Sequence, residues 1–415
     1  MELSTNNKLK KFIYNSSPND VSNITFIFDN IGSGTHREYP GIAHCIEHMI
    51  FKGNKSGIDI SQRLTELTGG LFNAYTAYNK TVFQVETKNI LPTIELLITM
   101  LSEPSFAKTE VEKEKTVIEH ELNLFLDNPI AHVVNLMSKS YTVGNKPVMS
   151  HDYIAQKNYL PNLNRETLIK VFNEKYSPDN CTLIISGNVN EQTLEDINSK
   201  IQKWNTKTSN DNNNIITCDY KPNIHLENAK TNSIYVSMFF NGPKSNDVSN
   251  TVNMYLLNTI LGTGLNSYFM KNIRVEKNLT YEISSFALQE KDHGIWGITT
   301  STDKKHLQDL LSSLKSQVKN LSKDIIKEDS IAVAKSLLLQ TIDLPPASPK
   351  IATTNSMFFN EVGVTKTELK SIINNTSCES MKNWYEKMIN TGMSLALYGD
   401  VSESEYASLN INTTW

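Results

Sequence analysis

The sequence predicts an α+β protein made of two tandem homologous domains, each a layered α/β arrangement of sheet and helices. Three observations support this fold class. The chain has 415 residues, which is too long for one ordinary hydrophobic core. Strand-like and helix-like segments alternate along it, as in layered domains. One pattern near the end of the first half also recurs near the end of the second half.

The recurring pattern indicates a duplication. FNEKYSPDNCTLIISGNVN (172–190) aligns with WYEKMINTGMSLALYGDVS (384–402) without a gap, and Gly187 falls on Gly399. Each copy reads as the end of a helix, a turn, an apolar strand and a Gly turn. A weaker echo relates YPGIAHCIEHMIFKG (39–53) to VSNTVNMYLLNTILG (248–262), which has no histidine or glutamate. The two halves therefore share a scaffold, but only the first can carry a polar cluster at this helix.

A polar segment separates the two predicted domains. Residues 209–219 lie in the most polar uncharged stretch of the chain, which is typical of a linker. The first domain is then 1–208 and the second is 220–415. In the first domain, three segments have the pattern of strands: 23–31, 72–87 and 181–189. Three others have the pattern of helices: 60–69, 90–104 and 109–126.

The composition is that of a globular protein, with 39% hydrophobic and 20% charged residues. A formal net charge of -4 provides no basic surface, which argues against nucleic acid as a partner. No secretory signal and no apolar run long enough to span a membrane is evident. The four cysteines lie far apart without a C-x-x-C spacing, so they suggest neither disulfides nor a thiolate metal site. We therefore expect a cytoplasmic protein.

The segment GIAHCIEHMIFKGN (41–54) has the apolar character of a buried helix but carries His44, Glu47 and His48. Residues four apart project from the same helix face, so the two imidazoles can bind one divalent metal. Glu47 lies beside them and could hold a water molecule. Unpaired polar groups on such a helix would cost several kcal/mol, which favours a metal site over a structural role. The order H-x-x-E-H is the inverzincin signature.

A catalytic zinc site has three protein ligands and one open position, so an acidic residue should complete the site. The predicted helix 109–126 offers four glutamates: Glu112, Glu114, Glu119 and Glu121. Its periodicity places Glu114 and Glu121 along one edge of the apolar face and Glu119 along the opposite edge. Periodicity alone leaves Glu121 and Glu119 as equal candidates.

Together these segments make the chain resemble the pitrilysin (insulinase-like) family of zinc metallopeptidases, and in particular half-length members such as the processing peptidases. The resemblance extends over nearly the whole chain. It is carried by GSGTHREYPGIAHCIEHMIFKGN, LTGGLFNAYTAYNKTVF, EKEKTVIEHELN, YSPDNCTLIISGNV and RVEKNLTY. It implies one zinc ion per chain, held by His44, His48 and Glu121, with Glu114 directly behind these ligands. It also implies that Glu47 is the general base that deprotonates the attacking water.

The resemblance also implies substrate contacts. FNAYTAY looks like the family's edge strand, which pairs with an extended peptide, so the backbone groups of Asn73 and Ala74 would bind substrate. RVEKNLTY looks like the element that carries an Arg/Tyr pair, here Arg274 and Tyr281, which would hold substrate carbonyls and the oxyanion. The segment departs from the family's usual REKRGLAY at 277–278, where an arginine and a glycine are replaced by lysine and asparagine.

The implied function is that of a zinc-dependent endopeptidase that cleaves unfolded peptides, or leader and targeting segments, inside a closed chamber. The chain would form one bowl of a two-bowl chamber. A second copy or a related chain would supply the other, giving a homodimer or a heterodimer. The alternative is a non-catalytic or peptide-binding partner subunit of a heterodimeric processing peptidase. Such subunits have a degraded H-x-x-E-H, whereas this motif is intact here.

Overall fold

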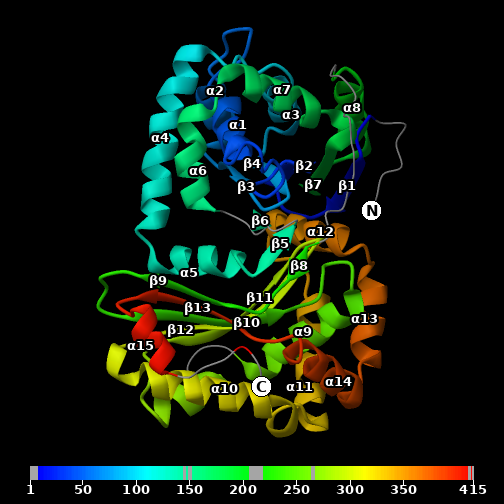
Figure 1. Ribbon diagram of the computed structural model, residues 1–415. Helices are drawn as coiled ribbons and strands as arrows, with labels where there is room; N and C mark the ends of the chain where they lie inside the picture. Colours follow the sequence, from blue (N-terminus) through cyan, green and yellow to red (C-terminus); the bar gives the residue numbers. More distant parts are fainter. Residues whose placement is uncertain are drawn as a thin grey trace. The chain divides into compact units, whose positions relative to one another are not determined.

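The computed structural model describes residues 8–143, 146–147, 152–204, 218–262, 267–409 and 413 (Figure 1). The expected linker 209–219 falls largely outside the described residues, which omit 205–217. The chain divides into two compact units. The first comprises Met1–Phe125, Ser150–Asn214 and Pro345–Phe358, and the second comprises Leu126–Met149, Ile215–Leu344 and Phe359–Trp415. None of the helices that the structure describes is long and apolar enough to cross a membrane.

The first unit contains a mixed five-stranded sheet with the order β1-β7-β2-β4-β3. Its strands are β1 (Lys11–Ser16), β2 (Ser22–Asp29), β3 (Phe72–Thr76), β4 (Lys80–Thr87) and β7 (Cys181–Gly187). β1 and β7 are parallel, and the other neighbours are antiparallel. The expected extended segment 72–87 is a hairpin, because Ala77 donates its N–H to the carbonyl of Lys80 at 2.8 Å and closes a turn. This turn leaves β3 as the outermost strand.

Helices cover this sheet because their apolar residues recur with helical spacing and can be buried on one face. They are α1 (Ile42–Ile50), α2 (Ile60–Thr68), α3 (Ile90–Ser102), α4 (Lys108–Leu126), α6 (Tyr153–Tyr159), α7 (Arg165–Lys175), α8 (Glu191–Gln202) and the 3-10 turns Leu160–Asn162 and Pro178–Asn180. The three helices expected at 60–69, 90–104 and 109–126 correspond to α2, α3 and α4. α1 packs against β3 and α7. All of its residues are buried except His44 and His48, which are half-buried.

Aromatic side chains fix the sheet to the end of α7 in the core of the first unit. Phe28 on β2 lies 4.7 Å from Tyr176 and 6.2 Å from Phe83 on β4, measured between ring centroids. All three rings are fully buried. Burying side chains of this size contributes about 1.5–3 kcal/mol each. These rings pack the sheet against the end of α7, and α7 also contacts α1, the helix that carries the histidines.

The second unit repeats the topology of the first. Its sheet has the order β11-β12-β10-β13-β9. The strands are β9 (Ile224–Asn228), β10 (Ile234–Asn241), β11 (Ile283–Gln289), β12 (Gly294–Thr302) and β13 (Ser394–Gly399). When the five strands of each sheet are numbered in chain order, both sheets have the strand order 1-5-2-4-3. In both sheets the first and fifth strands are parallel. Gly187 and Gly399 end the equivalent strands β7 and β13. The prediction of two homologous layered α+β domains is confirmed.

The remaining elements belong mainly to the second unit. Its helical segments are α5 (Pro129–Ser138), α9 (Val248–Leu261), η4 (Met270–Val275), η5 (Lys304–His306), α10 (Leu307–Asp324), α11 (Glu328–Asp343), α13 (Lys366–Asn375), α14 (Cys378–Ile389) and α15 (Glu403–Ser408), while α12 (Pro349–Val362) begins in the first unit. A small sheet has the order β6-β5-β8, with β5 (Tyr141–Val143), β6 (Lys146–Pro147) and β8 (Asp219–Tyr220). α5 lies along β9 and β13 (Figure 1) and contacts both strands.

Candidate metal centre

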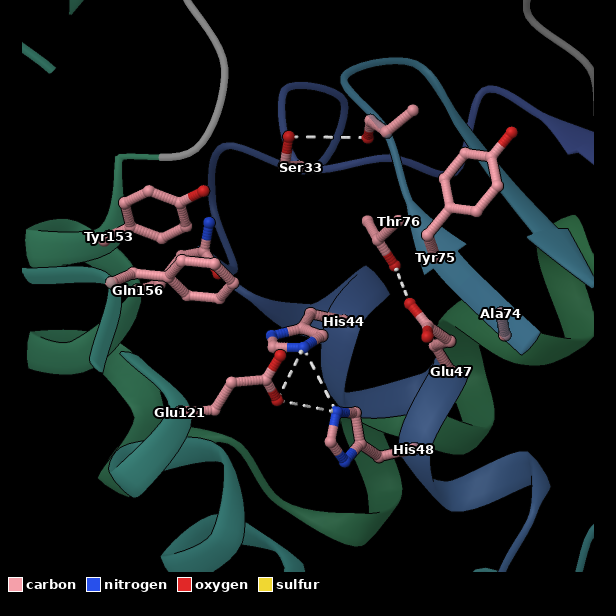
Figure 2. Close-up of a pocket in the computed structure, with 12 residues that line it drawn as sticks. Ser33, His44, Glu47, His48, Ala74, Tyr75, Thr76, Glu121, Tyr153 and Gln156 are labelled. Carbon is pink, nitrogen blue, oxygen red and sulfur yellow. Dashed lines mark hydrogen bonds and ion pairs between the residues drawn. The ribbon is translucent and has the colours of Figure 1, made fainter. Parts of the chain in front are cut away.

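Two helices of the first unit bring three potential metal ligands together (Figure 2). His44 and His48 project from one face of α1, and their Nε2 atoms lie 3.1 Å apart. Glu121 reaches them from α4, with its Oε2 at 3.6 Å from Nε2 of His44 and 3.3 Å from Nε2 of His48. Zinc in proteins is bound by imidazole nitrogen and carboxylate oxygen at about 2.0–2.2 Å. Three such donor atoms that face one point fit a single ion of this kind.

The structure distinguishes the two glutamates that periodicity left open. Glu121 is half-buried and lies with the histidines. Glu119 is exposed on another side of α4. The difference arises because α4 packs against the first unit through Val111, Ile118 and Leu122, which are buried.

Glu114 supports His48 from behind. Nδ1 of His48 lies 3.0 Å from Oε1 of Glu114, so this nitrogen donates its proton to the carboxylate. That contact leaves the lone pair on Nε2, which faces Glu121. Glu114 is only 4% exposed, and its other oxygen, Oε2, forms an ion pair with Nζ of Lys52 at 2.9 Å. The buried carboxylate therefore sets both the tautomer and the orientation of the His48 ring.

Hydrogen bonds within the group shift the pKa values of Glu121 and His48. Hydrogen bonds with His44 and His48 lower the pKa of the Glu121 carboxyl. Burial lowers the pKa of His48, but hydrogen bonds with Glu121 and Glu114 outweigh burial and raise it overall. Glu121 is therefore an anion at neutral pH, which is the form in which a carboxylate binds a metal.

Glu47 lies on α1 beside the ligands and is held by the neighbouring strand. Its Oε2 accepts a hydrogen bond from Oγ1 of Thr76 on β3 at 2.6 Å (Figure 2). Burial raises the pKa of the Glu47 carboxyl, and the hydrogen bond from Thr76 opposes this rise. A carboxyl whose pKa is raised by burial is suited to accept and release a proton. Sequence reasoning missed Thr76, although its place two residues after Ala74 on a half-buried strand indicates the same strand face.

The side chains of His44, His48, Glu121 and Glu47 line one cavity of about 440 Å³. Its lining residues are Ser33, His44, Glu47, His48, Ala74, Tyr75, Thr76, Ala77, Glu121, Phe125, Tyr153 and Gln156. The rings of Phe125 and Tyr153 stack with centroids 4.8 Å apart and form an aromatic wall. The cavity thus combines a largely apolar wall with a few convergent polar groups, as ligand sites do.

β3, which forms one wall of the cavity, is an edge strand, so its backbone pairs with β4 on one side only. The carbonyl of Leu71 accepts from the N–H of Glu86, and the N–H of Ala77 donates to Lys80, both at 2.8 Å. Bonded pairs alternate along an antiparallel ladder, so the backbone groups of Asn73 point toward β4 and those of Ala74 point away from it. Of the two residues expected to bind substrate, Ala74 has its backbone groups on the outer edge.

Arg274 and Tyr281 lie together at the surface of the second unit. Arg274 is in the short π-helical segment η4, and its Cζ lies 4.6 Å from the ring centroid of Tyr281. Tyr281 is 79% exposed. Asn278 lies between them with a φ of 52°, a left-handed conformation that asparagine adopts more readily than most residues. Asn278 is therefore suited to this turn between Arg274 and Tyr281.

In the zinc-dependent hydrolysis proposed below, replacing Glu114 by glutamine should reduce activity more than it reduces metal content. Glutamine keeps an acceptor oxygen for Nδ1 of His48 but loses the charge that stabilises its orientation. Loss of such a supporting carboxylate typically costs roughly 10- to 100-fold in activity. Zinc analysis and peptide hydrolysis on the same preparation measure both effects. Complete loss of zinc would instead make Glu114 a metal ligand.

In the same proposed reaction, replacing Thr76 by valine should lower the turnover rate without changing zinc content. Valine keeps the branched shape on β3 but removes the hydroxyl that donates to Glu47. A hydrogen bond to a charged group is worth roughly 1.5–3 kcal/mol, so kcat should fall about 10- to 100-fold if the full amount is lost. Because the outer backbone edge of β3 is unchanged, KM should stay close to that of the wild type. An unchanged kcat would show that Thr76 does not position Glu47.

Comparison with known proteins extends this description. The model of the insulinase family (peptidase family M16) matches residues 11–152, and the model of the M16 inactive domain matches residues 162–338. The protein named uncharacterized zinc protease YmxG from Bacillus subtilis is 26% identical over 316 residues, which are 74% of this chain and 75% of that protein. An uncharacterized zinc protease from Rickettsia felis is 24% identical over 374 residues, covering 87% of this chain and 88% of its own.

Solved structures share the fold. A protease from Helicobacter pylori superposes with a TM-score of 0.82 at 16% identity and covers 96% of this chain and 99% of its own. A chain of complex III from Candida albicans superposes with a TM-score of 0.80 at 16% identity and covers 99% of both chains. Two models of one family thus match most of the chain, and the His44–His48–Glu121 group lies within the first. The chain belongs to the insulinase (M16) family of peptidases, with an N-terminal peptidase domain followed by a C-terminal domain of the inactive type.

Proposed function

We propose that the protein is a zinc-dependent endopeptidase that cleaves unfolded peptides, including leader or targeting segments. The observation that carries this proposal is the convergence of His44, His48 and Glu121 beside Glu47 in one cavity. The names of the bacterial relatives, which describe zinc proteases, support it. Three ligands and a neighbouring acid–base group are the arrangement that metal-assisted hydrolysis of an amide bond needs.

Each residue has a distinct task in this proposal. Zinc, when bound, would lower the pKa of water and polarise the scissile carbonyl. Glu47 would accept a proton from the attacking water and return it to the leaving amine, a task suited to its raised pKa. Thr76 would hold the Glu47 carboxylate in place, and Glu114 would hold His48.

The substrate would bind as an added strand along β3. The N–H and C=O groups of Ala74 point away from β4 and can pair with an extended peptide. Main-chain pairing of this kind gives affinity with little dependence on side chains. Asn73, whose backbone groups point toward β4, would contribute through its exposed side chain. Only an unfolded or extended segment can pair in this way, so folded proteins should be poor substrates.

We further propose that two chains form the closed chamber, as a homodimer or as a heterodimer with a related chain. Among the relatives, the β subunit of the mouse mitochondrial-processing peptidase is 22% identical over 315 residues, and its name places it in an assembly. In the proposed dimer, Arg274 and Tyr281 of one chain would face the metal site of the other. There the guanidinium and the phenol would hold substrate carbonyls and stabilise the oxyanion.

Mixing two inactive variants should restore activity if the site is completed in trans. Glu47→Gln and Arg274→Ala are each expected to be inactive as homodimers. A mixed dimer contains one doubly altered site and one intact site, so random pairing should restore up to about a quarter of the wild-type activity. Differently tagged chains verify that subunits exchange. Mixed dimers that form but remain inactive would contradict the trans arrangement.

Incubating the purified protein with a random peptide mixture tests the proposed activity. We expect zinc in the protein and new internal cleavages, detected by mass spectrometry, that disappear when the metal is chelated. The alternative function, a non-catalytic or peptide-binding partner subunit, predicts that the peptides are retained but not cut. Zinc-loaded protein that binds peptides without cleaving them would therefore favour the alternative.

A further inference from the structure

A second group of potential metal ligands lies in the second unit, apart from the cavity described above. Sγ of Cys218 lies 3.2 Å from Oδ2 of Asp292, and Nδ1 of His293 lies 2.8 Å from Oδ1 of the same carboxylate. One ligand atom from each of the three residues falls within 4.8 Å of the others. The side chains of Asp292 and His293 are only 13% and 4% exposed, whereas Cys218 is half-buried. The group is therefore a mostly buried set of sulfur, oxygen and nitrogen donors.

The backbone holds two of these residues in a tight turn. Asp292 and His293 lie between β11 and β12, where the N–H of Glu290 donates to the carbonyl of His293 at 2.9 Å. The next residue, Gly294, is packed so closely that a Cβ there would lie 1.9 Å from the carbonyl oxygen of Pro243. The hydroxyl of Tyr141 donates to the Gly294 carbonyl at 2.8 Å. The turn is thus fixed from both sides before any ion binds.

The third residue is held by a different part of the same unit. Cys218 directly precedes β8, which pairs with β5 through Tyr220 and Tyr141. The ring of Tyr141 also lies 5.3 Å from the ring of His293, measured between centroids. Tyr141 therefore contacts both the strand that follows Cys218 and the turn that carries His293. Contacts of Tyr141 with β8 and with the turn, and not only the hydrogen bonds of the three donors, therefore bring the donors together.

We propose that Cys218, Asp292 and His293 form a second metal site for a divalent transition-metal ion such as Zn²⁺. Thiolate, imidazole and carboxylate are the zinc ligands of proteins, and donors of a tetrahedral zinc site lie roughly 3.3–3.6 Å from one another. In the structure the thiol and the imidazole contact different oxygens of Asp292, and one ligand atom from each residue lies within 4.8 Å of the others, so small side-chain movements bring the three donors onto one ion. Mg²⁺ and Ca²⁺ are poor candidates because they prefer oxygen ligands, and only one of the three side chains here, Asp292, supplies oxygen.

Binding at this site requires a defined change in protonation. The Cys218 thiol, which donates to Asp292 in the structure, would lose its proton to solvent and bind as the thiolate. Asp292 would bind as a carboxylate and His293 as a neutral imidazole. Three protein ligands leave one coordination position for water. The ion would connect the chain at 218 to a turn 74 residues further along and so stabilise the second unit.

Cobalt titration of the metal-free full-length protein tests this site, because a cobalt–thiolate bond gives an intense near-ultraviolet charge-transfer band. The His44–His48–Glu121 group contains no sulfur and cannot produce this band. We expect the band in wild-type protein and in His44→Ala/His48→Ala protein, and its loss in Cys218→Ser. Cys378→Ser is the matched control, because Cys378 is a buried thiol of the same unit whose Sγ lies near the carbonyl of Ile326, and it should keep the band.

Metal stoichiometry provides a second readout. After zinc loading and desalting, Cys218→Ser, Asp292→Asn and His293→Gln should each hold one zinc ion fewer per chain than the wild type, and circular dichroism verifies that each variant is folded. A wild-type protein that binds cobalt without a thiolate band would overturn the second site, as would a band that survives Cys218→Ser. Because the His44→Ala/His48→Ala protein is tested separately, failure of this proposal is distinguishable from failure of the proposed peptidase site.

Discussion

Glu47→Gln protein is expected to lose most of its peptide hydrolysis while it keeps its zinc. Glutamine has nearly the shape of glutamate and can still accept the hydrogen bond from Thr76, but it cannot take a proton from water. Loss of a general base typically lowers the rate by about 10² to 10⁴. Zinc should remain because Glu47 is not one of the three converging ligands. The expected result is therefore a metal-loaded, folded and nearly inactive protein.

The measurement is hydrolysis of a peptide mixture at matched zinc content. Glu66→Gln is a suitable control, since Glu66 is exposed on α2 and pairs with Arg63 outside the cavity. It carries the same chemical change and should behave like the wild type. Full activity in zinc-loaded Glu47→Gln protein would remove Glu47 from the catalytic role and leave the proton transfer to another group.

Glu121→Gln is expected to lower zinc occupancy sharply. The substitution removes the carboxylate proposed as a ligand, whose Oε2 lies 3.3 Å from Nε2 of His48 and 3.6 Å from Nε2 of His44. A neutral amide is a much weaker ligand for zinc than a carboxylate, so the remaining pair of imidazoles should hold the ion poorly. In the proposed metal-dependent hydrolysis, activity should fall with occupancy.

Glu119→Gln is the matched control for this experiment. Glu119 lies on the same helix, two residues away, but is exposed and remote from the histidines' converging face. Its variant should bind zinc and cleave peptides like the wild type. If Glu119→Gln lost zinc and Glu121→Gln kept it, the ligand assignment would be wrong by two residues. Metal analysis of both proteins after dialysis against a weak chelator decides between these outcomes.

The parts of the site that depend on local geometry could be predicted from the sequence. His44 and His48 share a helix face because of their spacing alone, and α1 forms where the apolar pattern places it. The third proposed ligand, Glu121, could not be predicted from local geometry. Helical periodicity put Glu119 and Glu121 on opposite edges of α4, and only the packing of α4 against the rest of the unit selects one edge. The resemblance to a peptidase family supplied this information before the structure did.

Contacts between segments far apart in the sequence could not be predicted from the spacing of residues. The segment 72–87 looks continuously extended, but a turn after Thr76 folds it into a hairpin and points the Thr76 hydroxyl at Glu47. The spacing of the cysteines argued against a thiolate site, yet the fold brings Cys218 to Asp292. The duplication was visible from one strand and its flanking helix, whereas the shared strand order required the structure.

Zinc readdition to stripped Cys218→Ser protein tests most directly whether hydrolysis depends on the metal at His44, His48 and Glu121. This variant removes the proposed second site, so bound zinc reports on the first site alone. Peptide cleavage is measured at each step while occupancy rises from zero to one ion per chain. We expect cleavage to rise in proportion to occupancy. In a variant that carries His44→Ala and His48→Ala together with Cys218→Ser, cleavage should be absent throughout. Cleavage that persists in the stripped protein, or that survives the loss of both histidines, would contradict a metal-dependent peptidase site in this cavity.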